Sequence, residues 1–213
     1  MAEKIKTKRK YDSSRRKRQA LETQVQILKA AERFFVERGY EGTSIDAIAR
    51  KAGVAPETIY SIFGSKRTIL SRVVDVAIVG DNDPIPLLAR SYIKEVEAET
   101  DQRRQIEMFA KRIQLIMSHV APLFEVMRSA SKTEPEIAAM LKKYLNGRIQ
   151  GMNYFFDCVR ANGALRMDKQ IAVETLWTLT SAEVYSLLIR DRGWSAREYE
   201  HWLAATLIRL LLP

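Results

Sequence analysis

The stretch TSIDAIARKAGVAPETIYSIFGSKRTIL, residues 43–70, decides the fold of this chain. Apolar residues recur at helical spacing before Gly53 and again after Pro56. Glycine adopts the left-handed conformation that ends many helices, and proline is favoured in a first helical turn. The pattern therefore predicts two short helices joined by a tight turn, which is a helix-turn-helix unit.

The residues before this stretch predict one longer helix. Its apolar face has a spacing of three and four residues and consists of Leu21, Val25, Leu28, Ala31 and Phe35. We expect this helix to begin near Arg15 and to stop at Gly39. Thr43 is expected to cap the second helix, with Asp46 completing an acidic variant of the capping box.

The residues after the stretch predict helices throughout. Ser65 can cap a fourth helix from Lys66 to about Val79, and the Asp, Asn and Pro residues at 81–86 mark a domain boundary. Beyond it we expect helices near 86–100, 102–119, 122–131, 135–161, 169–191 and 196–212. The predicted fold is all-α, with a disordered basic arm (1–14), a helix-turn-helix domain (15–80) and a larger helical domain (81–213).

The outer face of the third predicted helix carries mainly small and hydroxylated side chains. At 100° per residue, Glu57 and Ser61 point directly away from the apolar side, with Thr58 and Tyr60 on the flanks. Such groups suit a helix that enters a DNA major groove, which is about 12 Å wide. The alternative is an ordinary exposed polar face that binds nothing.

Residues 43–70 also contain a series of short motifs in order and without gaps. These are a Thr-Ser start, Ile-Ala, Ala-Gly-Val, Thr-Ile-Tyr, a Phe, and Ser-Lys before a further Ile-Leu. The series resembles the DNA-binding signature of the TetR family of bacterial transcriptional regulators. The resemblance covers about residues 15–75 closely, and the all-helical remainder agrees with it in length and class.

The resemblance implies that Thr58 and Tyr60 contact DNA and that Lys66 binds a phosphate. The residues expected at the DNA are Thr43, Ser44, Pro56, Glu57, Thr58, Tyr60, Ser61 and Lys66. Glu57 departs from the glycine or other small residue that is common at this position in the family. Its carboxylate can accept a hydrogen bond from a cytosine amino group, or it only favours the positive end of its own helix.

Charge is concentrated at the start of the chain. The net charge is +9, and residues 1–18 hold nine basic and two acidic residues. Such a basic tail on a nearly neutral body is typical of a protein that approaches a polyanion, usually nucleic acid. A solvated tail that only keeps the protein soluble is the alternative.

The composition argues against several other classes of protein. The chain has 213 residues, of which 46% are hydrophobic and 29% charged, as in ordinary globular proteins. His119 and His201 lie far apart, Cys158 is the only cysteine, and no phosphate-binding glycine loop or nucleophile elbow occurs. We expect no metal, no cofactor, no membrane span and no secretory signal, and hence a cytoplasmic protein that is not an enzyme.

The last helices predict a dimer. Apolar residues surround most of the helix expected at 196–212, whereas a surface helix needs only one apolar stripe. We expect a homodimer built from the last two helices, as is common in the TetR family, with interface residues Trp202, Leu203, Leu207 and Leu211. A fully buried hairpin within one subunit is the alternative.

The predicted ligand site combines Met, aromatic and polar residues of the larger domain. On the helix near 102–119, one apolar stripe is assigned to the core: Ile106, Phe109, Ala110, Ile113, Ile116, Met117 and Val120. The neighbouring mixed stripe and later helices supply the candidate ligand-binding residues Met108, Arg112, Leu115, His119, Tyr144, Met152, Phe155, Phe156 and Trp177. A place in an ordinary core is the alternative for each.

These observations predict a homodimeric transcriptional regulator. We expect a repressor that binds palindromic double-stranded DNA and is released when an unknown small molecule binds its C-terminal domain. A DNA-binding regulator without a ligand is the first alternative. An all-helical enzyme with an incidental basic tail is the second.

Overall fold

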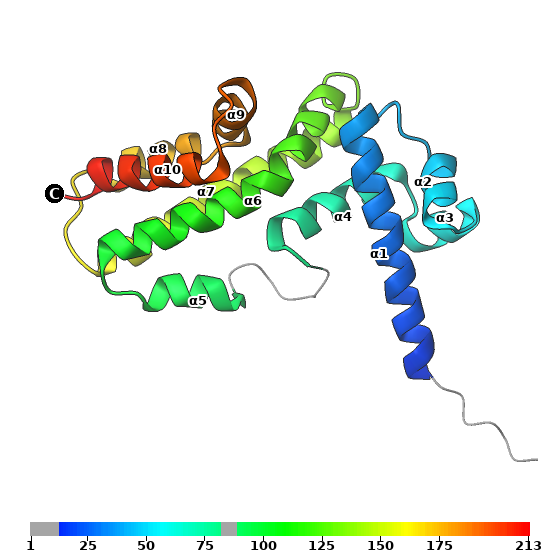
Figure 1. Cartoon of the computed structure of the whole chain (residues 1–213), viewed down its shortest axis with the longest axis horizontal. Coiled ribbons are helices and arrows are strands. Elements are labelled where there is room, and N and C mark those ends of the chain that lie inside the picture. The colour runs from blue at the N-terminus through cyan, green and yellow to red at the C-terminus, as the bar shows by residue number, and fades with distance from the viewer. Residues whose placement is uncertain (1–12, 82–88) are drawn as a thin grey trace, which may run out of the picture.

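The computed structural model describes residues 13–81 and 89–213, with side chains from Arg18 onward (Figure 1). Every regular element in these ranges is helical, as predicted. The N-terminal unit contains α1 (Ser13–Arg38), α2 (Ile45–Ala52), α3 (Pro56–Phe63) and α4 (Lys66–Val79). The C-terminal unit contains α5 (Ser91–Ala98), α6 (Gln102–Ala130), α7 (Pro135–Ala161), α8 (Lys169–Leu179), α9 (Ala182–Ser186), the π-helical turn η2 (Leu187–Asp191) and α10 (Ala196–Leu211).

Two predicted features fall largely outside the described residues. The basic arm lies there except for its last two residues, which already belong to α1. The boundary at 81–86 lies there except for Asp81.

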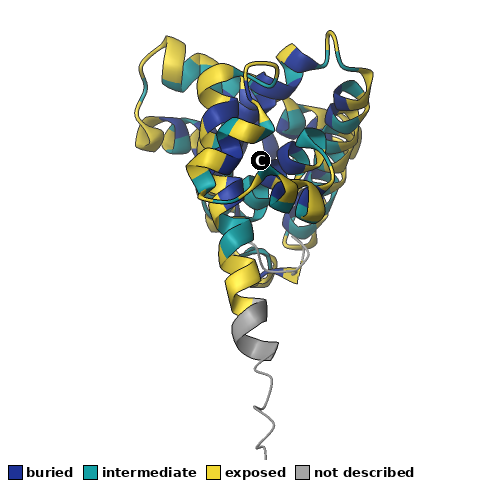
Figure 2. Cartoon of the chain, turned by 90° about the vertical axis from the view of Figure 1, so that its right-hand side faces the viewer, coloured by how far each residue is buried: buried dark blue, intermediate teal, exposed yellow. Residues whose placement is uncertain are grey.

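Only the second half of α1 packs against the rest of the N-terminal unit. Ile27, Ala31 and Phe35 are fully buried in the core, which also contains the inner faces of α2, α3 and α4. Residues 18–22 extend beyond this core, and Figure 2 colours this part of α1 as exposed. Leu21 was predicted on the core face and is instead 51% exposed, because no other element reaches this far along α1.

Gly53 makes the tight turn between α2 and α3. Its φ angle is +69°, and its N–H donates to the carbonyl oxygen of Ala49. A residue with a side chain costs roughly 1–2 kcal/mol in this left-handed conformation. Pro56 is the first residue of α3. The predicted helix-turn-helix is therefore confirmed at both ends of its turn.

The predicted cap of α2 is wrong by one residue. Ser44 is the cap, and its hydroxyl oxygen accepts the N–H of Ala47 at 3.2 Å. Asp46 is then one position too early for the expected capping box. The Thr43 hydroxyl donates instead to the carbonyl oxygen of Gly39 at 2.7 Å, and this bond braces the loop between α1 and α2.

Helix α6 is continuous where two helices were predicted. Pro122 lies inside it, and an interior proline costs about 3 kcal/mol. Its neighbours Val120, Leu123 and Phe124 are all at least 98% buried. Burying each of these side chains contributes about 1.5–3 kcal/mol, so packing outweighs the cost of the proline.

The single helix predicted at 169–191 is divided into α8, α9 and η2. Thr180 and Ser181 cause the first break. The buried Thr180 hydroxyl donates to the carbonyl oxygen of Leu176 at 2.7 Å, and the Ser181 hydroxyl oxygen accepts the N–H of Val184 at 3.2 Å. Such side-chain bonds compete with the helical ladder. Helix α7, by contrast, occupies the predicted range without change.

Candidate DNA-binding surface and ligand cavity

The outer face of α3 is free in the described structure. Glu57 and Ser61 are exposed and Tyr60 is 54% exposed, whereas Pro56 and Thr58 are half-buried. On the opposite side of the helix, Ile59 and Phe63 are buried in the core. The predicted orientation of α3 is thus confirmed, and its contact with DNA remains a prediction.

Thr43 and Ser44 differ in what they can offer to DNA. Thr43 is 1% exposed, and its hydroxyl donates a hydrogen bond to the carbonyl oxygen of Gly39. The prediction that Thr43 contacts DNA is therefore wrong. Ser44 is exposed at the N-terminus of α2. Free N–H groups at a helix N-terminus favour a phosphate, and Ser44 stays a candidate.

Lys66 holds two loops of the N-terminal unit together. Its ammonium donates to the carbonyl oxygens of Tyr40 at 2.8 Å and Thr43 at 3.0 Å, and it lies 4.1 Å from the centre of the Tyr40 ring. Burial lowers the pKa of this lysine. Two of its three donors are therefore occupied, and a phosphate contact would use the third.

We expect Lys66→Ala to lower the free energy of unfolding by about 1–3 kcal/mol, because two carbonyl groups lose a charged donor. Urea unfolding monitored by circular dichroism measures this change. Lys51→Ala is the matched control, since Lys51 is an exposed lysine in the last turn of α2. Equal stability of the two variants would contradict the bracing role of Lys66.

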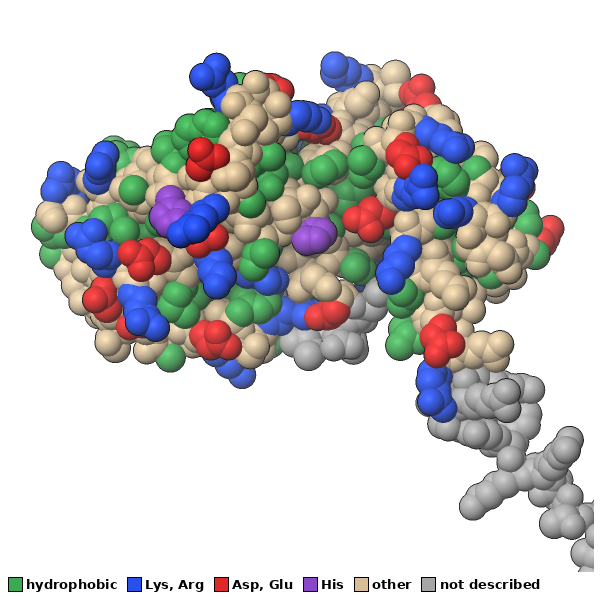
Figure 3. Space-filling model, viewed as in Figure 1, with side chains coloured by type: hydrophobic (Ala, Val, Ile, Leu, Met, Phe, Trp, Pro, Cys, Tyr) green, Lys and Arg blue, Asp and Glu red, His purple; other side chains and the backbone are tan. Residues whose placement is uncertain are grey.

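Basic side chains are spread over both units on the face drawn in Figure 3, with acidic side chains between them. On the N-terminal unit, Arg50 and Lys51 lie exposed in the last turn of α2. This mixed surface matches the nearly neutral body predicted from the sequence.

The C-terminal unit contains an apolar cavity of about 380 Å³. Its walls come from α5, α6 and α7, with Ile78 near the end of α4 at one side. Such a volume lies at the lower end of the range of roughly 300–1,000 Å³ for small-molecule sites. The rings of Phe109 and Phe155 stack on its wall with 3.7 Å between their centres.

Four of the nine predicted ligand residues line this cavity. They are Arg112, Tyr144, Met152 and Phe155. The other five predicted residues are placed elsewhere: Leu115 and His119 are exposed, Met108 lies on the outer side of α6, Phe156 is buried in the core, and Trp177 bonds to the carbonyl oxygen of Leu145.

The stripe of α6 that the sequence assigned to the core provides most of the cavity wall on that helix. Its cavity-lining members are Phe109, Ile113, Ile116, Met117 and Val120. The core assignment is confirmed, since Ile113, Met117 and Val120 are buried in the core. The sequence did not show that these residues also line a cavity, because a cavity wall and a packed core have the same apolar composition. Arg148 also lines the cavity but was not among the predicted ligand residues. The only sign of it in the sequence was its position four residues after Tyr144, on the same face of α7.

The polar groups of the cavity reach toward neighbouring helices. Arg112 lies 3.5 Å from the centre of the Tyr92 ring and donates to the carbonyl oxygen of Val79 at 3.4 Å. Arg148 donates to the carbonyl oxygen of Trp177 at 2.8 Å. These contacts connect the cavity to α4, α5 and α8.

Tyr144 links α7 to α4. Its hydroxyl donates to Asp75 Oδ1 at 2.7 Å and lies 3.1 Å from both Ser71 oxygens. Burial raises the pKa of the Tyr144 phenol, so the hydroxyl keeps its proton at neutral pH.

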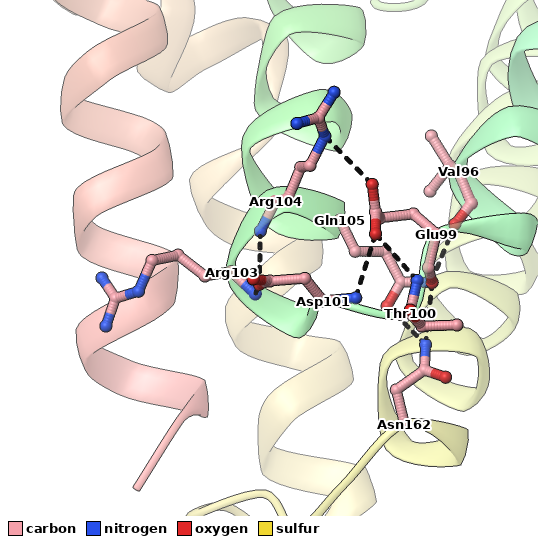
Figure 4. Close-up of polar contacts among 8 residues, drawn as sticks. All are labelled: Val96, Glu99, Thr100, Asp101, Arg103, Arg104, Gln105 and Asn162. Atoms are coloured by element: carbon pink, nitrogen blue, oxygen red, sulfur yellow. Dashed lines mark hydrogen bonds and ion pairs between the residues drawn. The ribbon is translucent and has the colours of Figure 1, made fainter.

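The C-terminal end of α5 is fastened to α6 and α7 (Figure 4). The side chain of the fully buried Gln105 donates to the carbonyl oxygen of Val96 at 2.8 Å. Asn162 donates to the carbonyl oxygen of Glu99 at 3.0 Å, and the Glu99 carboxylate accepts the N–H of Asp101 at 3.0 Å. Because Val96 lines the cavity, this network holds one of its walls in place.

The predicted dimer residues are mostly internal. Leu203, Leu207 and Leu211 are at least 99% buried within one subunit, where α10 packs on α6. The prediction that these three leucines form a dimer interface is therefore wrong. The alternative, burial within one subunit, is confirmed for this side of α10. Trp202 is half-buried and stacks edge-on against Trp194.

Another face of α8 and α10 remains open. Ile171 is 55% exposed, and it shares a shallow groove with Thr175, Thr178 and Leu210. This groove is an exposed and partly apolar surface that the two helices share.

A family of known proteins matches the helix-turn-helix region. The model of bacterial regulatory proteins of the TetR family matches residues 27–73, which run from the second half of α1 into α4. The helix-turn-helix region of this chain is therefore similar to that of the TetR family. The HTH-type transcriptional activator FasR of Mycolicibacterium smegmatis is 28% identical to this chain over 118 residues, which are 55% of this chain and 51% of that relative. Regions aligned with this chain span 29–59% of the length of such HTH-type relatives.

Solved structures share the fold of most of this chain. The regulator FadR of Bacillus subtilis, solved with stearoyl-CoA, has a TM-score of 0.67 at 17% identity and covers 86% of this chain and 97% of its own. A protein of Saccharomonospora viridis, solved with choline, has a TM-score of 0.65 at 19% identity and covers 88% of this chain and 96% of its own.

Two further features are absent from the described ranges 13–81 and 89–213. No helix there is long and apolar enough to cross a bilayer. No group of three or more His, Cys, Asp or Glu side chains there is arranged to hold a metal ion.

Proposed function

We propose that this chain is a DNA-binding transcriptional regulator that acts in the cytoplasm as a homodimeric repressor. The free outer face of α3 carries this proposal, since a buried inner face and an exposed outer face are what a recognition helix needs. The names of the family relatives support it. The recognition helices of two subunits would enter major grooves about 34–36 Å apart, on a palindromic operator.

The effector site of this regulator is the cavity between α5, α6 and α7. Two proteins of similar fold that were solved with stearoyl-CoA and with choline support a small-molecule ligand for this chain. The cavity is tied to α4 through Tyr144 and Arg112, and α4 begins at Lys66, beside the helix-turn-helix. A ligand that moves α7 or α6 would therefore shift α4 and, with it, α3. Such coupling typically changes DNA affinity by about 1–3 kcal/mol.

Selection of bound DNA from random sequence tests the proposed function. We expect a palindromic site with half-sites centred 10–10.5 base pairs apart or a multiple of that spacing. Recovery of sequences without a shared motif would contradict a sequence-specific regulator.

We expect Tyr60→Phe to weaken binding to all DNA sequences by a similar factor, because a hydroxyl contact to phosphate carries affinity and little base identity. Ser61→Ala is expected to change the preference at one base pair, since Ser61 lies at the centre of the exposed face of α3. Titrations with the selected site and single-base variants of it measure both effects. A base-specific change in Tyr60→Phe would overturn its assignment.

We expect Tyr144→Phe to weaken operator binding by the unliganded protein several-fold, because α4 loses the hydrogen bonds that the Tyr144 hydroxyl makes to it. Fluorescence anisotropy with the selected operator measures the affinity. Tyr154→Phe is the matched control, since Tyr154 also lines the cavity from α7 but interacts with Glu97. Equal operator affinities in the two variants would refute a coupling role for Tyr144.

A further inference from the structure

The charged side chains of the cavity are all basic. Among the described residues that line it are Arg112, Lys143 and Arg148, and none is Asp or Glu. Lys143 is exposed at the rim, whereas both arginines are half-buried. Burial lowers the pKa of Arg148, but an arginine remains charged in a protein. The cavity therefore presents positive charge without a carboxylate on its described walls.

Three hydrogen-bond donors of the cavity residues are shielded from solvent and unpaired. They are Arg112 Nε, Arg148 Nη1 and Tyr92 Oη, none of which has an acceptor among the described residues. A buried donor without an acceptor is costly, so such a group in a folded protein calls for a partner.

Two other arginines of the described chain, the buried Arg90 and the partly exposed Arg128, have carboxylate partners. Arg90 is 92% buried and forms a two-pronged pair with Asp81, and Arg128 pairs with Glu183. A carboxylate is the group that matches a guanidinium in geometry and charge. Arg112 and Arg148 differ from these arginines in making hydrogen bonds only to neutral oxygens.

We propose that the cavity binds an apolar molecule that carries a carboxylate, with Arg112 and Arg148 as its anion-binding residues and Tyr92 as a further donor. This inference rests on the proposed function, because it takes the cavity as the effector site. The carboxylate supplies the acceptor that the unpaired donors lack. A cationic ligand would face repulsion from both guanidinium groups.

The rest of the cavity fits the apolar part of such a ligand. Its walls are built from aliphatic and aromatic side chains, including the stacked pair Phe109 and Phe155. A volume of 380 Å³ holds about twelve water-sized groups at roughly 30 Å³ each. A saturated carboxylate of medium chain length, such as decanoate, fits this volume.

Calorimetric titration of the full-length protein with three probes of equal chain length tests the proposal. The probes are decanoate, decanol and decyltrimethylammonium, each used below its micellar concentration. We expect decanoate to bind at least about tenfold more tightly than either of the others, because a hydrogen bond to a charged group is worth about that factor. Equal or tighter binding of decanol or decyltrimethylammonium overturns the proposal, and so does the absence of decanoate binding.

Substitutions assign the effect to the arginines. We expect Arg112→Met and Arg148→Met each to weaken decanoate binding at least about tenfold and to leave decanol binding nearly unchanged. Lys143→Met removes the same charge from the exposed rim and should have a smaller effect. Arg112→Lys and Arg148→Lys keep the positive charge but lose the planar guanidinium group. We expect these variants to bind decanoate with intermediate affinity, which shows that the cavity is folded and that it recognises charge.

The outcomes separate this inference from the proposed function. If both Met variants bind decanoate as tightly as Lys143→Met does, the arginines are not the anion site and the proposal fails. Selection of operator DNA is carried out without any ligand. Specific DNA binding with no preference for decanoate overturns the ligand class alone, whereas decanoate binding without specific DNA binding overturns the regulator.

Discussion

Replacing Leu207 with glutamate should unfold the C-terminal unit rather than separate two subunits. Leu207 is fully buried where α10 packs on α6. Loss of a buried leucine costs about 2–5 kcal/mol, and an unpaired buried carboxylate adds several more. Together these approach the whole stability of a domain, which is about 5–15 kcal/mol. Circular dichroism and limited proteolysis of the purified variant measure the loss of structure.

Ile171→Glu is the control for this prediction. Ile171 is 55% exposed on α8, beside the groove that α8 and α10 share. We expect this variant to keep its melting temperature at low concentration and to sediment as a monomer. A folded, monomeric Leu207→Glu protein would instead restore Leu207 as an interface residue. A dimeric Ile171→Glu protein would place the subunit contact elsewhere.

The helices of the N-terminal unit could be predicted from the sequence because their ends carry local signals. Gly53 adopts a positive φ, which glycine allows, and Pro56 suits the first turn of a helix. These two residues therefore predict where α2 ends and where α3 begins. The error at Thr43 has the same local origin. Thr43 and Ser44 are both good caps, and only tertiary packing decides which hydroxyl faces the core.

The C-terminal unit depends on packing that no local pattern reveals. Pro122 predicts a helix end, but burial of its neighbours keeps α6 continuous. The sequence pattern of α10 does not show whether its leucines face the core of their own subunit or a second subunit. The wall of the cavity and a filled core likewise have the same composition, so the sequence could not show that the core residues Phe109 and Met117 also line a cavity. Only a charged residue such as Arg112 distinguished one face from the other.

Deleting residues 1–12 should lower DNA affinity strongly without changing the fold. These residues lie before α1 and hold five basic residues against two acidic ones. If about two basic groups in each subunit neutralise phosphates, a dimer releases about four fewer counterions after the deletion. The plot of log K against log salt then becomes shallower by roughly 3–4 units, at about 0.9 per phosphate. At 0.1 M salt this corresponds to a loss on the order of a thousandfold.

A full-length variant with neutral side chains in the arm separates the effect of charge from the effect of chain length. In this control, glutamine replaces the basic residues Lys4, Lys6, Lys8, Arg9 and Lys10. Titrations of the three proteins with the selected operator at several salt concentrations give the slopes. We expect the glutamine variant to match the deletion, because phosphate contacts depend on charge. Base preference should change little in either variant, since an arm that follows phosphates carries little sequence information. Parallel lines for all three proteins would show that the arm does not touch the DNA.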